Sequence, residues 1–297
     1  MIPLAEFLTL RTLLADYPVT HAMRTGEVAS PLVRFDFAPF KPSNKGFKPM
    51  VRENAFDFGE LAIVTYLQAR ERGWPFVLLP ATIVGRFQHH CIAYNVERGA
   101  VRPEDLSGKR IGVRAYTQTT GMWVRGILQN QYGVDLSSIE WLTFEEAHVV
   151  GYENPSNVVL APPDKSLKDM LLDGELDAAM LGDEMPDDPR LRTVVPDPKA
   201  AAEAWYRQTG AIPVNHLAVV SEALCRERPD VVRELSRLLN ESKERVGPVE
   251  GIDTRPSGIE ALRPGLELAI RYSRQQGLIC REMSVEELFD DTTIGVA

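Results

Sequence analysis

Histidines are the residues of this chain best suited to proton transfer, because an unperturbed imidazole titrates near neutral pH. Three of the five, His89, His90 and His216, fall in apolar segments that we expect to be extended. Neighbouring strand residues face opposite sides, so His89 and His90 cannot both point into one site. We predict that His89 or His216 is the proton donor. His90 is not expected to donate the proton and is assigned to substrate binding. The alternative for each is a hydrogen-bonded core residue.

Two carboxylates follow predicted buried strands. Glu60 comes after the strand at residues 56–58, and Asp183 comes after the strand at residues 176–181. Ligands bind beyond the carboxyl ends of strands in open α/β sheets, so we place both at the site, Glu60 in catalysis and Asp183 in substrate binding. The alternative for Glu60 is a carboxylate that complements the dipole of the helix expected from Leu61.

An anion site is predicted where a polar loop joins a strand at residues 109–115 to a helix. The unpaired N–H groups and the dipole at a helix start favour an anion. Arg125, about one turn into the helix, is predicted to pair with a carboxylate, and Arg86 is either a second such cation or a salt-bridge partner at the hinge. The alternative is a helix cap with a surface arginine. The loop residues assigned to substrate binding are Tyr116, Thr117, Gln118, Thr119 and Thr120.

Strand and helix signals alternate along most of the chain, which predicts an α/β protein with mainly parallel sheets. We expect residues 1–96 to begin a first lobe, residues 97–214 to form a second, and residues 215–297 to return to the first. The ligand cleft would then lie between the lobes, close to the two crossings.

Two motifs indicate a known fold. Residues 105–113 (DLSGKRIGV) and 171–179 (LLDGELDAA) resemble the recurring signatures of the type 2 periplasmic-binding-protein fold. Other residues resemble the 4,5-dihydroxyphthalate decarboxylase family more narrowly. They are Asp16-Tyr17, Thr20 and Ala22; Phe56-Asp57 with Glu60-Leu61; Gly85-Arg86-Phe87-Gln88-His89; and Tyr116-Thr117-Gln118-Thr119 with residues 123–128. Arg114 and residues 143–163 depart from the pattern of that family.

This resemblance implies an enzyme that decarboxylates a hydroxylated aromatic carboxylate without an organic cofactor. It also places Tyr17 among the substrate-binding residues. Such a reaction needs a cationic or N–H cage for the carboxylate, an acceptor for the phenol and an acid that protonates the ring carbon. The alternatives are a non-catalytic solute-binding protein for a small anion, as in ABC transporters, and a menaquinone-pathway lyase of the same fold.

Composition limits the partners. The 33 Lys and Arg against 42 Asp and Glu give a net charge of −9, so nucleic acid is not expected as a partner. No apolar run reaches the roughly 20 residues of a membrane helix, and the histidine spacing supplies no convergent metal ligands. The N-terminal residues lack the pattern of a signal peptide, and the three cysteines are far apart, so we expect a cytoplasmic protein with reduced thiols. A homo-oligomer is compatible with the sequence, which does not define the oligomeric state.

Overall fold

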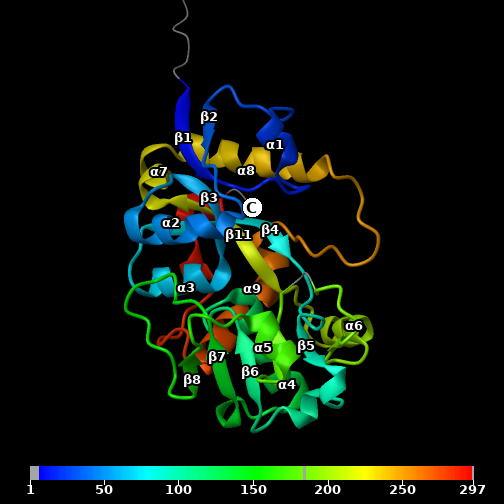
Figure 1. Cartoon of the computed structure of the whole chain (residues 1–297). Coiled ribbons are helices and arrows are strands. Elements are labelled where there is room, and N and C mark those ends of the chain that lie inside the picture. Colours follow the sequence, from blue (N-terminus) through cyan, green and yellow to red (C-terminus); the bar gives the residue numbers. More distant parts are fainter. Residues whose placement is uncertain (1–6, 183–184, 296–297) are drawn as a thin grey trace, which may run out of the picture.

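The computed structural model describes residues 7–182 and 185–295 and contains two β-sheets (Figure 1). The first sheet has the order β2-β1-β3-β11-β4. Strand β1 is parallel to β2 and β3, whereas β11 lies antiparallel between β3 and β4. Strand β11, from the C-terminal third of the sequence, therefore lies between two strands from its N-terminal third. The strands are β1 (Leu8–Leu13), β2 (Val33–Phe37), β3 (Phe58–Ala62), β4 (Phe76–Gly85) and β11 (Val214–Ser221).

The second sheet has the order β10-β5-β9-β6-β7-β8. Strands β6, β7, β8 and β9 are mutually parallel, and β5 is antiparallel to both β9 and β10. Both sheets are therefore mixed, although the predicted α/β class is confirmed. The strands are β5 (Ile92–Asn95), β6 (Arg110–Val113), β7 (Glu140–Thr143), β8 (Val158–Leu160), β9 (Ala178–Met180) and β10 (Leu191–Thr193).

Helices accompany both sheets. In Figure 1, α1, α7 and α8 lie with the first sheet in the upper half, and α4, α5 and α6 lie with the second sheet below. The helices are α1 (His21–Thr25), α2 (Phe47–Glu53), α3 (Ile63–Glu71), α4 (Thr119–Tyr132), α5 (Leu167–Asp173), α6 (Pro198–Thr209), α7 (Glu222–Glu227), α8 (Pro229–Glu244), α9 (Ile259–Gln275) and α10 (Asp291–Ile294). No described helix is long and apolar enough to cross a membrane.

The chain passes between the sheets twice. Strand β5, expected at the end of the first lobe's segment, pairs instead with β9 and β10 of the second sheet. Val214, expected in the second lobe, begins β11 of the first sheet. We therefore propose crossings through residues 86–91 and 194–213, each a little earlier than the boundaries predicted at 96/97 and 214/215.

Local sequence signals at α4 predict its bounds. The helix begins at Thr119 and ends before Gly133, which has a φ of 68° that suits glycine. Gly126 faces α9 so closely that a Cβ there would meet a ring carbon of Tyr272 at 2.0 Å. Trp123 donates from Nε1 to the carbonyl of Val214 at 2.9 Å. Helix α4 is thus fixed against both α9 and the start of β11.

Three predicted elements are wrong in detail. Glu60 lies within β3 rather than after a strand, because β3 is buried between β1 and β11 and continues to Ala62. His89 and His90 lie in a turn closed by the Cys91 N–H and the Gln88 carbonyl at 3.0 Å, and not in a strand. Pro264 favours a helix start at its own position, but helix α9 begins earlier, at Ile259, and the burial of Leu262 stabilises this earlier turn.

Candidate active site

A cavity of about 720 Å³ is lined by residues of the first sheet, by residues that directly follow strands β6 and β9 of the second sheet, and by Arg86 of the first crossing. This volume is within the range of about 300–1,000 Å³ for small-molecule sites. Its walls include the start of α4, the loop after β1, the start of α2 and residues near the ends of β4 and β11. The predicted location of the cleft close to the crossings agrees with this cavity.

The start of α4 forms one wall. Thr117, Gln118, Thr119 and Thr120 all line the cavity. The first hydrogen bond of the helix runs from the Met122 N–H to the Gln118 carbonyl at 2.9 Å, so the N–H groups of residues 119–121 precede the helical ladder. The buried Oε1 of Gln118 has no hydrogen-bond partner among the described residues. This wall offers N–H groups, hydroxyls and the positive end of a long helix to an anion.

Three arginines line the same cavity: Arg86, Arg114 and Arg255. Arg86 donates to the Thr120 Oγ1 at 3.3 Å, and Arg114 forms an ion pair of 3.5 Å with Glu145. No Asp or Glu side chain of the described residues lines the cavity. Within the part of the chain that the structure describes, the Lys, Arg, Asp and Glu side chains that line the cavity are therefore all arginines, although the chain has a net charge of −9. The predicted Asp183 lies outside the described residues.

Of the two predicted proton donors, His216 lines the cavity, and the buried carboxylate of Glu60 contacts it. His216 lies on β11 and lines the cavity, and its Nδ1 is 2.6 Å from Oε2 of Glu60 on the adjacent strand β3. Glu60 itself is fully buried and does not line the cavity. It also accepts hydrogen bonds from the Ala15 N–H at 2.8 Å and from the Tyr17 hydroxyl at 3.2 Å.

This arrangement defines the role of the imidazole. A carboxylate at Nδ1 fixes the ring orientation and stabilises the imidazolium form, and it leaves Nε2 as the ring nitrogen for a ligand. Glu60 therefore meets the cavity only through the two side chains that contact it, His216 and Tyr17.

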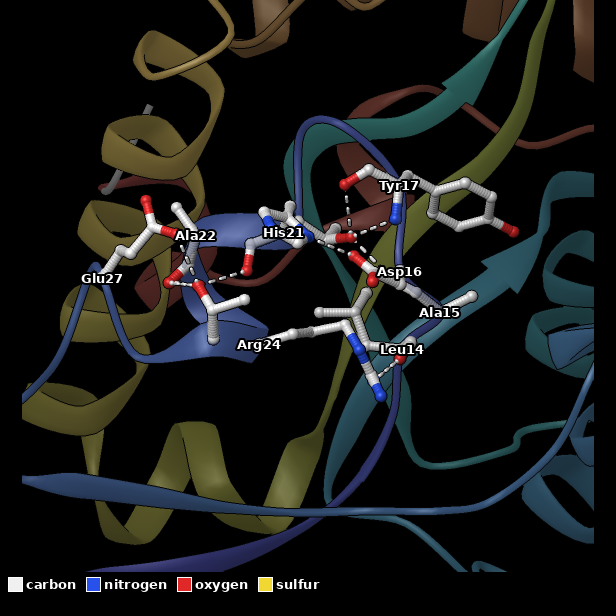
Figure 2. A network of polar contacts seen from close by, with 10 residues as sticks. Leu14, Ala15, Asp16, Tyr17, His21, Ala22, Arg24 and Glu27 are labelled. Atoms are coloured by element: carbon white, nitrogen blue, oxygen red, sulfur yellow. Dashed lines mark hydrogen bonds and ion pairs between the residues drawn. The ribbon is translucent and has the colours of Figure 1, made fainter.

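The loop after β1, whose polar contacts are drawn in Figure 2, places Tyr17 at the cavity. Arg24 donates to the Leu14 carbonyl, the Thr20 hydroxyl donates to the Ala15 carbonyl at 2.7 Å, and the Tyr17 N–H donates to Thr20 Oγ1 at 2.9 Å. In the figure the Tyr17 ring extends away from α1. Burial and the Glu60 carboxylate raise the pKa of Tyr17, so its hydroxyl remains a neutral donor to Glu60.

His148, which the sequence marks only as a weaker candidate, also lines the cavity. Its Nδ1 is 2.9 Å from the Thr65 hydroxyl, and the Phe47 ring lies edge-on to both His148 and His216, with centroids 5.8 Å and 5.2 Å away. Burial, with Arg114 the largest charge contribution, lowers the pKa of His148 to about 4. The cavity therefore contains a neutral imidazole, that of His148. Ser43, Asn44 and Asn215 line it as well, and no local motif distinguished them.

Four predicted site residues lie elsewhere, two of them histidines. His89 is buried, has Nε2 2.9 Å from Gln131 Oε1 and meets the Trp205 ring edge-on. Burial lowers its pKa. His90 does not line the cavity and has Nε2 3.6 Å from the Cys91 sulfur. The prediction of His89 as a proton donor at this cavity is wrong, because the turn directs it toward α4 and α6.

The other two are Tyr116 and Arg125. Arg125 is fully buried, donates to Gln276 Oε1 at 2.8 Å and to the Tyr116 carbonyl at 2.6 Å, and lies 3.9 Å from the centroid of the Tyr116 ring. Neither residue lines the cavity. Arg125 is on the face of α4 that packs against α9, so it joins these helices and does not bind the carboxylate as predicted.

Comparison with known proteins supports the sequence resemblance. No family model matches the chain. It is 30% identical over 207 residues to the 4,5-dihydroxyphthalate decarboxylase of Comamonas testosteroni, and 32% identical over 169 residues to that of Pseudomonas putida. The resemblance to these decarboxylases is confirmed. The aligned parts are 63% and 52% of this chain and 61% and 65% of the relatives, so the chain matches less than two thirds of their length.

Solved structures share the fold at low sequence identity. The alkanesulfonate-binding protein SsuA of Xanthomonas axonopodis pv. citri, bound to MOPS, has a TM-score of 0.60 and 14% identity over 96% of this chain and 99% of that one. The desulfurization enzyme DSZB, in complex with biphenyl-2-sulfinic acid, has a TM-score of 0.57 and 13% identity over 97% and 98%. The predicted two-lobed binding-protein fold is confirmed, and this fold carries both binding proteins and enzymes.

Proposed function

We propose that this protein is a carboxy-lyase that removes CO2 from a hydroxylated aromatic carboxylate of the 4,5-dihydroxyphthalate type. The observation that carries the proposal is the pairing of a cationic cavity with an imidazole backed by a buried carboxylate. The cations explain the binding of an anion, and the Glu60–His216 pair adds an acid that binding alone does not require. The decarboxylase relatives favour the same chemistry.

Substrate binding is assigned to the α4 start and the arginines. The carboxylate that leaves would accept hydrogen bonds from the N–H groups and hydroxyls of residues 117–120, with Arg86 beside them. Charge-assisted hydrogen bonds of this kind are about twice as strong as neutral ones. They hold the reacting carbon at a fixed position, which lowers the entropic part of the barrier.

The chemical step needs one proton and releases one CO2. Protonated His216 donates from Nε2 to the ring carbon that bears the carboxylate. A hydroxyl para to that carbon supplies electron density, the bond between the ring and the carboxylate breaks, and its electron pair returns to the ring as CO2 leaves. His216 regains a proton from solvent. Glu60 stabilises the imidazolium before the transfer, and the neutral His148–Thr65 pair is suited to hydrogen-bond a ring hydroxyl.

A solute-binding protein for a small anion is the second candidate, because the SsuA structures share the fold. It uses the same arginines and helix start and predicts tight binding without turnover. A cytoplasmic location and a homo-oligomer are further predictions that accompany the enzyme.

Turnover distinguishes the two candidates. The full chain is incubated with 4,5-dihydroxyphthalate and with a panel of mono- and dihydroxybenzoates, and released CO2 is measured. The enzyme releases one CO2 per dihydroxyphthalate consumed. Binding by calorimetry with no CO2 from any acid of the panel would favour the binding protein.

A further inference from the structure

Arg255 differs from the other arginines of the cavity in its contacts. Arg86 donates to Thr120 and Arg114 pairs with Glu145, whereas the Arg255 guanidinium forms no hydrogen bond or ion pair with any described residue. Its Nε is buried and has no hydrogen-bond partner within residues 7–182 and 185–295. A buried donor without a partner costs free energy of folding, and an anionic ligand would remove that cost.

The backbone around Arg255 is fixed in place. The Arg255 N–H donates to Asp253 Oδ1 at 2.9 Å, and Lys243 Nζ is 2.8 Å from Asp253 Oδ2 and also donates to the Arg255 carbonyl.

Backbone hydrogen bonds join the segment that contains Arg255 to β4. The Thr82 N–H donates to the Pro256 carbonyl at 3.3 Å, and the Gly258 N–H donates to the Pro80 carbonyl at 2.8 Å. Gly85 permits this contact, since a Cβ there would meet the Thr254 carbonyl oxygen at 2.0 Å. A cation on a fixed backbone can select a ligand group because little ordering is needed when it binds.

We propose that Arg255 determines substrate specificity by binding a second anionic group on the ring, the one that remains in the product. This rests on the proposed function and extends it. The α4 start and Arg86 bind the carboxylate that leaves, and Arg255, from the segment between α8 and α9, binds the other. The cavity therefore selects aromatic diacids over aromatic monoacids.

The test uses two unreactive ligands, phthalate and benzoate, which differ by one carboxylate. Their binding to the full chain is measured by calorimetry for the wild type, Arg255→Gln, Arg255→Lys and the control Arg245→Gln, whose arginine is exposed at the end of α8 and does not line the cavity. We expect Arg255→Gln to weaken phthalate binding at least tenfold and benzoate binding less than twofold. Arg255→Lys should recover part of the loss, and Arg245→Gln should bind both ligands as the wild type does.

Equal weakening of both ligands, no weakening of either, or wild-type binding of phthalate no tighter than of benzoate would each overturn the role of Arg255. Melting temperatures of the variants identify a folding defect, and the phthalate-to-benzoate ratio is independent of the fraction folded. CO2 release is measured separately. A wild type that binds phthalate through Arg255 but releases no CO2 from any dihydroxylated acid would refute the proposed function and leave this inference standing.

Discussion

The first crossing between the sheets carries His89, the strand that follows the second crossing carries His216, and the surroundings of these two histidines differ. At the first crossing, His89 lies in a turn, with an amide from α4 at one nitrogen and the Trp205 ring beside it. After the second crossing, His216 lies on β11, with the Glu60 carboxylate at Nδ1 and the cavity beside it. A neutral amide oxygen stabilises an imidazolium less than a carboxylate does, and burial lowers the pKa of His89 in spite of its hydrogen bond to Gln131. We therefore expect acid chemistry at His216 and not at His89.

The largest effect is expected when the hydrogen-bond partner of each histidine is changed in turn. Glu60→Gln keeps the size of the side chain and removes its charge, so the imidazolium of His216 loses its stabilisation. We expect kcat to fall by about 100-fold or more, in line with the contribution of general acid catalysis. Gln131→Ala, the matched change at His89, should change kcat by less than threefold. Steady-state CO2 release by both variants measures this, and similar losses in the two would contradict the comparison.

The second prediction concerns Arg125, which is buried and, unlike Arg86, Arg114 and Arg255, does not line the cavity. Arg125→Met leaves the carbonyl of Tyr116 and Oε1 of Gln276 without their donor. We expect a loss of about 2–4 kcal/mol in the free energy of unfolding, since each unpaired buried group costs about 1–3 kcal/mol. Denaturant unfolding measures it, with exposed Arg233→Met as the control. An unchanged stability together with a large rise in KM would restore Arg125 to the site.

Tyr17→Phe should sharpen the role of the Glu60 network. The variant removes one donor to Glu60 and keeps the ring. One neutral hydrogen bond contributes about 0.5–1.5 kcal/mol, so kcat/KM should fall about two- to tenfold. Because burial and the Glu60 carboxylate raise the pKa of Tyr17, its hydroxyl stays protonated, and the alkaline limb of the pH–rate profile should be the same in both proteins. A loss as large as that of Glu60→Gln would make Tyr17 itself the proton donor.

The smallest expected effect concerns His148. Burial lowers its pKa to about 4, while an unfolded histidine titrates near 6.5. The unfolded chain therefore binds this proton first as the pH falls, and folded stability is lost between pH 6.5 and 4. In His148→Gln this contribution is absent, so the melting temperature should fall less steeply over that window. Parallel curves for the wild type and the variant would show that His148 does not titrate in this way.

Sequence patterns predicted the local structure around the start of α4 well, and the polar residues 117–120 predicted there line the cavity. The helix that starts at Thr119 and ends before Gly133 is encoded by neighbouring residues, and so are the polar side chains that precede it. The Glu60–His216 contact joins residues 156 positions apart, and it exists because β11 is inserted next to β3. No local pattern reports such an insertion.

The errors have the same origin. Arg125 looks like a surface or ligand-binding arginine until α9 covers it, and Gly126 permits that close packing. His89 and His90 were expected in a strand because apolar residues surround them, but a single turn hydrogen bond sets their directions. The predicted residues that do reach the cavity are those on the α4 start, Tyr17, Arg86 and His216.

The central claim is that His216 protonates the ring carbon while other residues bind the acid. The most direct measurement compares His216→Asn with the wild type in two assays, CO2 release from 4,5-dihydroxyphthalate and calorimetric binding of the same acid. His21→Asn, a change at an exposed histidine outside the cavity, is the control. We predict that His216→Asn binds the acid within about fivefold of the wild type and loses about 100- to 10,000-fold in kcat. A His216→Asn variant that retains full turnover would contradict the account.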